Sequence, residues 1–93
     1  MGFMSETECV CYEWAALVRG AKVVTVELRS AKPALVHVSQ RGPSNGAPSL
    51  VLTKDNRRVQ FTNLGKRDTV YCKAKIKGTH AVITAMADKG QTP

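Results

Sequence analysis

Short runs of alternating hydrophobic and polar residues dominate the chain from residue 22 to residue 86. Side chains two positions apart lie on the same face of a β-strand, so each run predicts a strand with one buried and one exposed face. The runs cover residues 23–28, 34–38, 50–53, 58–62, 70–77 and 81–86. Turn-forming residues separate them, including Lys54-Asp55-Asn56 and Gly78-Thr79. We therefore expect an all-β fold, a small antiparallel β-sandwich or barrel of about seven short strands.

Each run has one set of alternate positions that is apolar, and these positions predict the core. One residue from each run represents its buried face: Val26, Val36, Leu52, Phe61, Cys72 and Ile83. Removal of the Phe61 ring from a fully buried position would cost about 3–5 kcal/mol. The core prediction therefore has an energetic consequence that can be measured.

The first twenty residues fit two interpretations. Ser5 and Glu8 have the spacing of a helix capping box, and good helix formers follow from Cys9 to Val18. Val10, Tyr12 and Trp14 also alternate with Cys11 and Glu13, which favours a strand and would supply the seventh. We expect a single β domain over 1–93, with an N-terminal segment (1–20), a β core (22–86) and a C-terminal arm (89–93).

The formal net charge of +7 is distributed unevenly along the chain. Residues 1–28 contain four carboxylates and two cations, whereas residues 29–93 contain twelve cations and three carboxylates. Such a basic region favours an anionic partner, either nucleic acid or an acidic protein surface. It is equally compatible with a solvated surface that keeps the protein in solution.

A basic patch is the specific sequence feature that suggests nucleic acid. Lys73, Lys75 and Lys77 would project with Tyr71 from one face of a strand, and Arg57 and Arg58 form a second cluster. Binding of single strands also needs exposed aromatic rings for base stacking, and only 5% of the residues are aromatic. Nucleic acid is therefore the less favoured partner.

No combination of residues predicts catalysis or a cofactor. His37 at an outward strand position and His80 at the start of the last strand are the only histidines, and neither belongs to a catalytic motif. The chain has no phosphate-binding glycine loop and no serine elbow. We expect a protein that is not an enzyme and needs no cofactor.

The three cysteines are Cys9, Cys11 and Cys72. Cys9 and Cys11 would share a strand face and could form half of a metal site, but two small apolar side chains are the more common arrangement, so we expect no metal. The odd count and the acidic N-terminus without a following apolar stretch predict free thiols and a cytoplasm-like compartment. No apolar run reaches the roughly 20 residues that span a membrane.

One long loop is predicted between residues 41 and 48. It is rich in Gly, Pro, Ser and Asn, and it is longer than a hairpin requires. Loops of this type are either mobile surface segments or places where a partner binds. The candidate contacts are Arg41, Pro43, Asn45 and Pro48.

The order of features from Lys22 to Thr84 resembles small β-sandwich structural proteins of tailed bacteriophage particles. The segments that carry the resemblance are VVTVELRS, PALVHVSQ, LVLTKDNRRVQF, VYCKA and AVIT. The resemblance implies a non-enzymatic subunit of the virion, as a head decoration, collar, tail or fibre component. It further implies assembly in the host cytoplasm with copies of itself and other virion proteins. The alternatives are a basic β-barrel that binds nucleic acid and a small protein-interaction module.

Overall fold

The computed structural model describes residues 2–43 and 49–88, and these residues form β-strands without a helix. The strands are β1 (Gly2–Cys9), β2 (Ala15–Arg19), β3 (Val23–Leu28), β4 (Ala34–Ser39), β5 (Leu50–Leu52), β6 (Arg58–Phe61), β7 (Thr69–Ala74) and β8 (Ala81–Asp88). Within these ranges no helix is long and apolar enough to cross a lipid bilayer.

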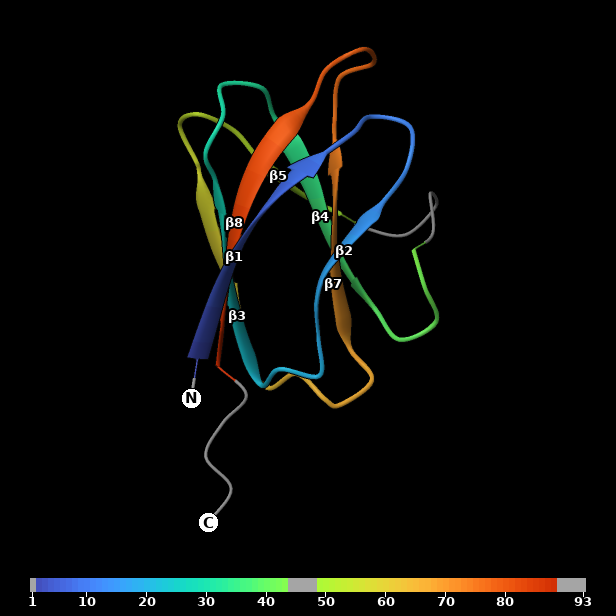
Figure 1. Cartoon of the computed structure of the whole chain (residues 1–93), viewed down its shortest axis with the longest axis vertical. Coiled ribbons are helices and arrows are strands. Elements are labelled where there is room, and N and C mark those ends of the chain that lie inside the picture. Colours follow the sequence, from blue (N-terminus) through green and yellow to red (C-terminus); the bar gives the residue numbers. More distant parts are fainter. Residues whose placement is uncertain (1, 44–48, 89–93) are drawn as a thin grey trace.

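The strands form two four-stranded sheets that pack face to face (Figure 1). The order in sheet A is β1-β8-β3-β6, and the order in sheet B is β2-β7-β4-β5. All neighbouring strands are antiparallel. The predicted all-β antiparallel sandwich is confirmed, with eight strands where the sequence indicated about seven.

Small aliphatic side chains fill the space between the sheets. Val24, Val26 and Leu28 of β3 are completely or almost completely buried, and they alternate with the half-buried Val23, Thr25 and Glu27. The same alternation places Ala81, Ile83, Ala85 and Ala87 of β8 in the core. Five of the six predicted core residues are at most 1% exposed: Val26, Val36, Leu52, Cys72 and Ile83.

The sixth predicted core residue, Phe61, is only half buried. Its inward position is confirmed, since it packs against the core cluster from β6. However, β6 is an edge strand, and beyond its free side no further strand of the described chain covers the ring. The prediction of a fully buried phenylalanine was therefore wrong in degree, and the energetic cost of its removal must be lowered accordingly.

The N-terminal segment contains two strands rather than one. β1 ends at Cys9, β2 begins at Ala15, and residues 10–14 form the irregular connection between the two sheets. A strand is therefore confirmed for residues 15–18, while the alternation of Val10, Tyr12 and Trp14 does not mark one. The predicted arm at 89–93 lies outside the described residues.

The expectation of free thiols was wrong for two of the three cysteines. Cys9 and Cys72 form a disulfide, with Cα atoms 6.3 Å apart and 63 positions of separation in sequence. The Ala74 N–H donates to the Val10 carbonyl at 2.9 Å, so the chain leaving β1 runs beside β7. Both cysteines are fully buried, and the bond covalently joins sheet A to sheet B. Cys11 is the free cysteine of the described chain.

Removal of the disulfide should lower the stability of the domain strongly. Chain-entropy arguments give about 4 kcal/mol for a closed loop of this size. We expect that loss in the double variant Cys9→Ala/Cys72→Ala, and in the wild type under reducing conditions, as measured by urea unfolding. Cys11→Ser is the matched control and should unfold like the wild type with and without reductant. Equal stability of the wild type with and without reductant would contradict the bond.

Phe61 and Ile83 should respond differently to truncation because their burial differs. Ile83→Ala removes a fully buried side chain and should cost about 2–5 kcal/mol. Phe61→Ala should cost less than the roughly 3–5 kcal/mol of a fully buried aromatic ring, since the Phe61 ring is only partly buried. Urea unfolding of both variants checks this order. A larger loss for Phe61→Ala would show that the ring is covered in solution.

Candidate assembly surface

The predicted basic stripe of three lysines on one strand does not form. β7 ends at Ala74, so Lys73 lies on the strand while Lys75 and Lys77 lie in the following bend and turn. Ile76, which the alternation would bury, is 45% exposed in the same turn. The alternating pattern of the sequence thus continues past the end of the strand, and this prediction was wrong.

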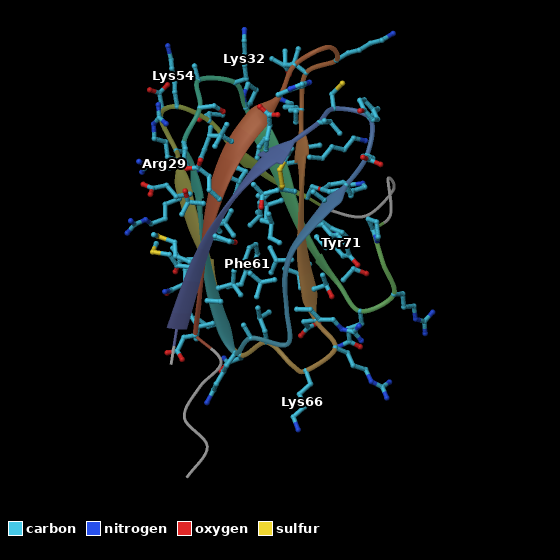
Figure 2. The ribbon with its side chains drawn as sticks, viewed as in Figure 1. Arg29, Lys32, Lys54, Phe61, Lys66 and Tyr71 are labelled. Carbon is cyan, nitrogen blue, oxygen red and sulfur yellow. A yellow bond between two sulfur atoms is a disulfide. The ribbon has the colours of Figure 1, made fainter. Side chains whose placement is uncertain are left out.

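The remaining basic residues are distributed over different surfaces. Arg58 projects from the outer face of sheet A, whereas Lys73 projects from the outer face of sheet B. Lys32 and Lys66 lie at opposite ends of the molecule (Figure 2). A nucleic-acid strand would need these charges along one path. Of the predicted patch, Arg58 and Lys73 therefore lie on different faces of the sandwich.

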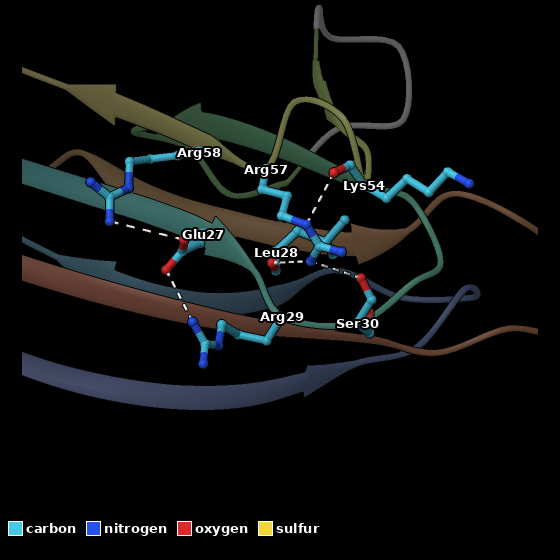
Figure 3. A network of polar contacts seen from close by, with 7 residues as sticks. All are labelled: Glu27, Leu28, Arg29, Ser30, Lys54, Arg57 and Arg58. Carbon is cyan, nitrogen blue, oxygen red and sulfur yellow. Dashed lines mark hydrogen bonds and ion pairs between the residues drawn. The ribbon is translucent and has the colours of Figure 1, made fainter.

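Arg57 has a local structural role. Its guanidinium group donates to the carbonyl oxygens of Lys54 at 3.0 Å, Leu28 at 3.0 Å and Ser30 at 3.4 Å (Figure 3). Lys54 lies in the turn before β6, Leu28 is the last residue of β3, and Ser30 lies in the connection after β3. Arg57 therefore holds two neighbouring loops together.

Glu27 forms a small charge network next to that anchor. Its carboxylate lies 3.3 Å from the Arg29 guanidinium and 3.9 Å from that of Arg58 (Figure 3). The Arg58 side chain is 62% exposed, and ion pairs of this kind are worth at most about 1 kcal/mol. Arg58 is consequently only loosely held within its own chain.

An aromatic cluster covers part of the outer face of sheet B. The Trp14 and His37 ring centroids are 5.7 Å apart, and the Lys73 ammonium group lies 5.6 Å from the Trp14 ring centroid. His37 points outward from β4 as predicted, yet it is only 8% exposed. The Trp14 ring therefore already contacts two side chains of its own chain.

The remaining candidate residues, the cysteines and His80, each have a contact within their own chain. Cys9 is part of the disulfide, and Cys11 Sγ accepts a hydrogen bond from the Gly78 N–H at 3.2 Å. His80 Nδ1 lies 3.7 Å from a Glu8 carboxylate oxygen. Within 2–43 and 49–88, no three His, Cys, Asp or Glu side chains are grouped so that they could hold a metal ion.

The predicted partner loop is only partly described. Arg41 and Pro43 are exposed, and the Arg41 N–H donates to Ser39 Oγ at 3.1 Å. Asn45 and Pro48 lie outside the described residues. Next to this loop, a groove of about 580 Å³ opens between the edge strands β5 and β6, with Leu50, Phe61 and Leu64 among its lining residues.

The free edges of the sheets differ in length and regularity. In sheet B, β2 is interrupted by a bulge between Ala16 and Val18, and β5 has three residues. In sheet A, β6 has four residues, whereas β1 has eight and pairs with β8 in unbroken register from Gly2 to Cys9. Short or bulged edges resist pairing with another chain, and a long regular edge favours it. β1 is the most suitable edge for an added strand.

The hydrogen-bonding pattern shows which backbone groups of β1 face outward. The Arg29 N–H donates to the Val82 carbonyl at 2.7 Å, so Val82 and its alternate neighbours on β8 pair with β3. The intervening residues of β8 point their peptide groups the other way and therefore pair with β1. Their partners on β1 are Thr7 and Ser5, among others. The peptide groups of Met4, Glu6 and Glu8 consequently face away from β8 and have no strand partner in the described chain.

The same reasoning applies at the opposite edge. The Leu28 N–H donates to the Arg57 carbonyl at 2.7 Å, so Arg57 and its alternate neighbours on β6 pair with β3. The peptide groups of Arg58 and Gln60 face away from the sheet. Their side chains are exposed on its outer face. Each edge of sheet A thus offers a defined set of unpaired peptide groups.

Comparisons of the chain with protein-family models, with curated proteins and with solved structures each gave no match. The functional interpretation therefore rests on the geometry of the chain itself.

Substitution of the adjacent residues Arg57 and Arg58 should change the free energy of unfolding by very different amounts. Arg57→Gln removes the hydrogen bonds to three carbonyl groups and should lower the free energy of unfolding by about 1–2 kcal/mol, since bonds to charged groups are strong. Arg58→Gln, the matched control, should change it by at most about 0.5 kcal/mol. Urea unfolding measures both. If the two variants lost equal stability, Arg57 would not be the anchor of the two loops.

Proposed function

We propose that this chain is a non-enzymatic structural subunit that acts through protein–protein assembly. The observation that carries the proposal is β1, an eight-residue edge strand in regular register whose outer peptide groups have no strand partner within the described residues. Such an edge is a template for a strand of another chain. A small domain with a thin core also gains more from neighbours than a large one does.

Within this class, the resemblance of the strand order to structural proteins of tailed phages suggests the particle of such a phage as the place of assembly. The Cys9–Cys72 disulfide is compatible with this proposal, because disulfides persist at virion surfaces and in other oxidising environments. Detection of the chain by mass spectrometry in purified phage particles tests the location. Absence of the chain from such particles would contradict the phage location and leave only the proposal of an assembly module of another kind.

The nucleic-acid alternative has less support. The three lysines that suggested it do not share one strand face, and Arg57 is bound to carbonyl groups of its own chain. The dispersed charges should give no more than weak, non-specific binding, with a dissociation constant of about 10⁻⁴–10⁻⁶ M at physiological salt.

A proline at position 4 tests the role of the β1 edge. The Met4 N–H faces away from β8, so Met4→Pro removes an outward donor without removing a bond of the β1–β8 ladder. We expect a folded protein whose association, measured by sedimentation or light scattering, is clearly reduced. Met4→Ala keeps the N–H and is the control. Unchanged association of Met4→Pro would show that assembly does not use this edge.

A further inference from the structure

We propose that copies of this chain pair head to tail, with β1 of one copy added to β6 of the next, so that sheet A continues from molecule to molecule. The inference rests on the proposed function and names the partner, which is a second copy of the same chain. It is carried by the charges, the register and the free peptide groups of the two edges of sheet A.

The two edges of sheet A carry opposite charge. β1 presents Glu6 and Glu8 on exposed outward positions and contains no cation. β6 presents Arg58, which is exposed and weakly paired, and contains no acidic residue. Because β8 and β3 separate the two strands, the charges cannot neutralise each other within one molecule. The carboxylates on β1 of one molecule can instead pair with the arginine on β6 of another.

The register of the sheet aligns these charges in one row. Glu6 is opposite Thr84, Thr84 is opposite Glu27, and Glu27 is opposite Arg58. If sheet A continues into the following copy without a shift along the strand direction, Arg58 lies opposite Glu6 of that copy. In the same register Gln60 is opposite Met4 of that copy.

The unpaired peptide groups fit the same register. Arg58 and Gln60 face outward from β6, and Glu6 and Met4 face outward from β1, so both pairs can exchange hydrogen bonds. A shift by one residue would place outward groups opposite inward ones. Strand direction also agrees: the strands of sheet A alternate, so β1 of a following copy with the same sheet orientation is antiparallel to β6.

A two-fold pairing of β1 with β1 is the competing arrangement. It would place the Glu6 and Glu8 side chains of both copies along one seam, with no cation on either strand to balance them. Like charges across neighbouring strands are destabilising. Charge therefore favours the head-to-tail arrangement over the two-fold one.

Head-to-tail contacts form a closed ring when the rotation between copies completes a circle, and a helical filament when it does not. The four residues of β6 limit each contact to about four backbone hydrogen bonds. A single contact is accordingly weak. Closure of a ring, in which no edge of sheet A is left unpaired, would stabilise the whole assembly.

Charge reversal with mixing tests the pairing. In the proposed register, Glu6→Arg places a cation opposite Arg58 of the next copy, and Arg58→Glu places a carboxylate opposite Glu6 of the next copy. Each variant alone should associate roughly three- to tenfold more weakly than the wild type. In an equimolar mixture, alternation of the two variants restores opposite charges at each contact and should regain association well above that of either variant alone. Sedimentation velocity between about 10 µM and about 1 mM protein measures this.

Two control variants carry the same change in net charge away from the edges. Glu13→Arg matches Glu6→Arg and lies in the connection between β1 and β2, and Lys66→Glu matches Arg58→Glu and lies in the loop before β7. Both should associate within about twofold of the wild type, a difference too small for the loss of a cross-strand charge pair. Association of the wild type should also fall as salt rises from about 50 to about 500 mM.

The outcomes separate the inference from the proposed function. An oligomer that is insensitive to both edge reversals overturns the β1–β6 pairing and leaves assembly through another surface. Stronger association of Glu6→Arg alone, with Arg58→Glu unchanged, overturns it in favour of two-fold pairing. A wild type that remains monomeric over the whole concentration range contradicts both the pairing and self-assembly.

Discussion

The exclusion of water from between two thin sheets is the constraint on which this structure depends. The inner faces consist mainly of valine and alanine, and the largest fully buried side chains are Leu28, Leu52 and Ile83. Such side chains let the sheets approach closely, but each contributes only modest burial energy. The disulfide between Cys9 and Cys72 adds a covalent link across the same interface. Small side chains and one cross-link thus hold the two sheets together across a thin core.

The topology of sheet A converts a gradient of charge along the sequence into a separation of charge in space. The acidic N-terminal part supplies β1 at one edge, and the basic middle part supplies β6 at the other. The two central strands, β8 and β3, keep these edges apart. Net charge alone would indicate only a basic protein, whereas the arrangement indicates a molecule with two unlike edges. This separation of charge is the basis of the proposed pairing between copies.

The sequence predicted those strands whose alternation coincides with burial. β3 and β8 were found because each has apolar side chains at every inward position. β1 was missed because its inward positions include Ser5 and Thr7, which are polar and only half buried. The extended run to Lys77 was wrong because alternation in sequence does not show where a strand ends.

Contacts between distant residues were beyond prediction from local patterns. The pairing of Cys9 with Cys72 depends on the way β1 and β7 face each other across the sandwich, and the count of cysteines contains no information on that geometry. Similarly, His37 is buried on an outer face where Trp14 comes from a different segment. The candidate edges were likewise invisible in the sequence, since an edge is defined by the absence of a neighbouring strand.

The pairing of β1 with β8 has a consequence for the order of folding. The first strand of the described chain hydrogen-bonds along its full length with the last one, from Gly2 opposite Asp88 to Cys9 opposite Ala81. During synthesis, β1 therefore waits for almost all later residues before its ladder can form, and such non-local pairing is slow. The edge that we propose for assembly becomes a regular strand only when β8 has emerged. Copies that are still being translated lack that edge, so the proposed contact would form only between molecules whose sheet A is complete.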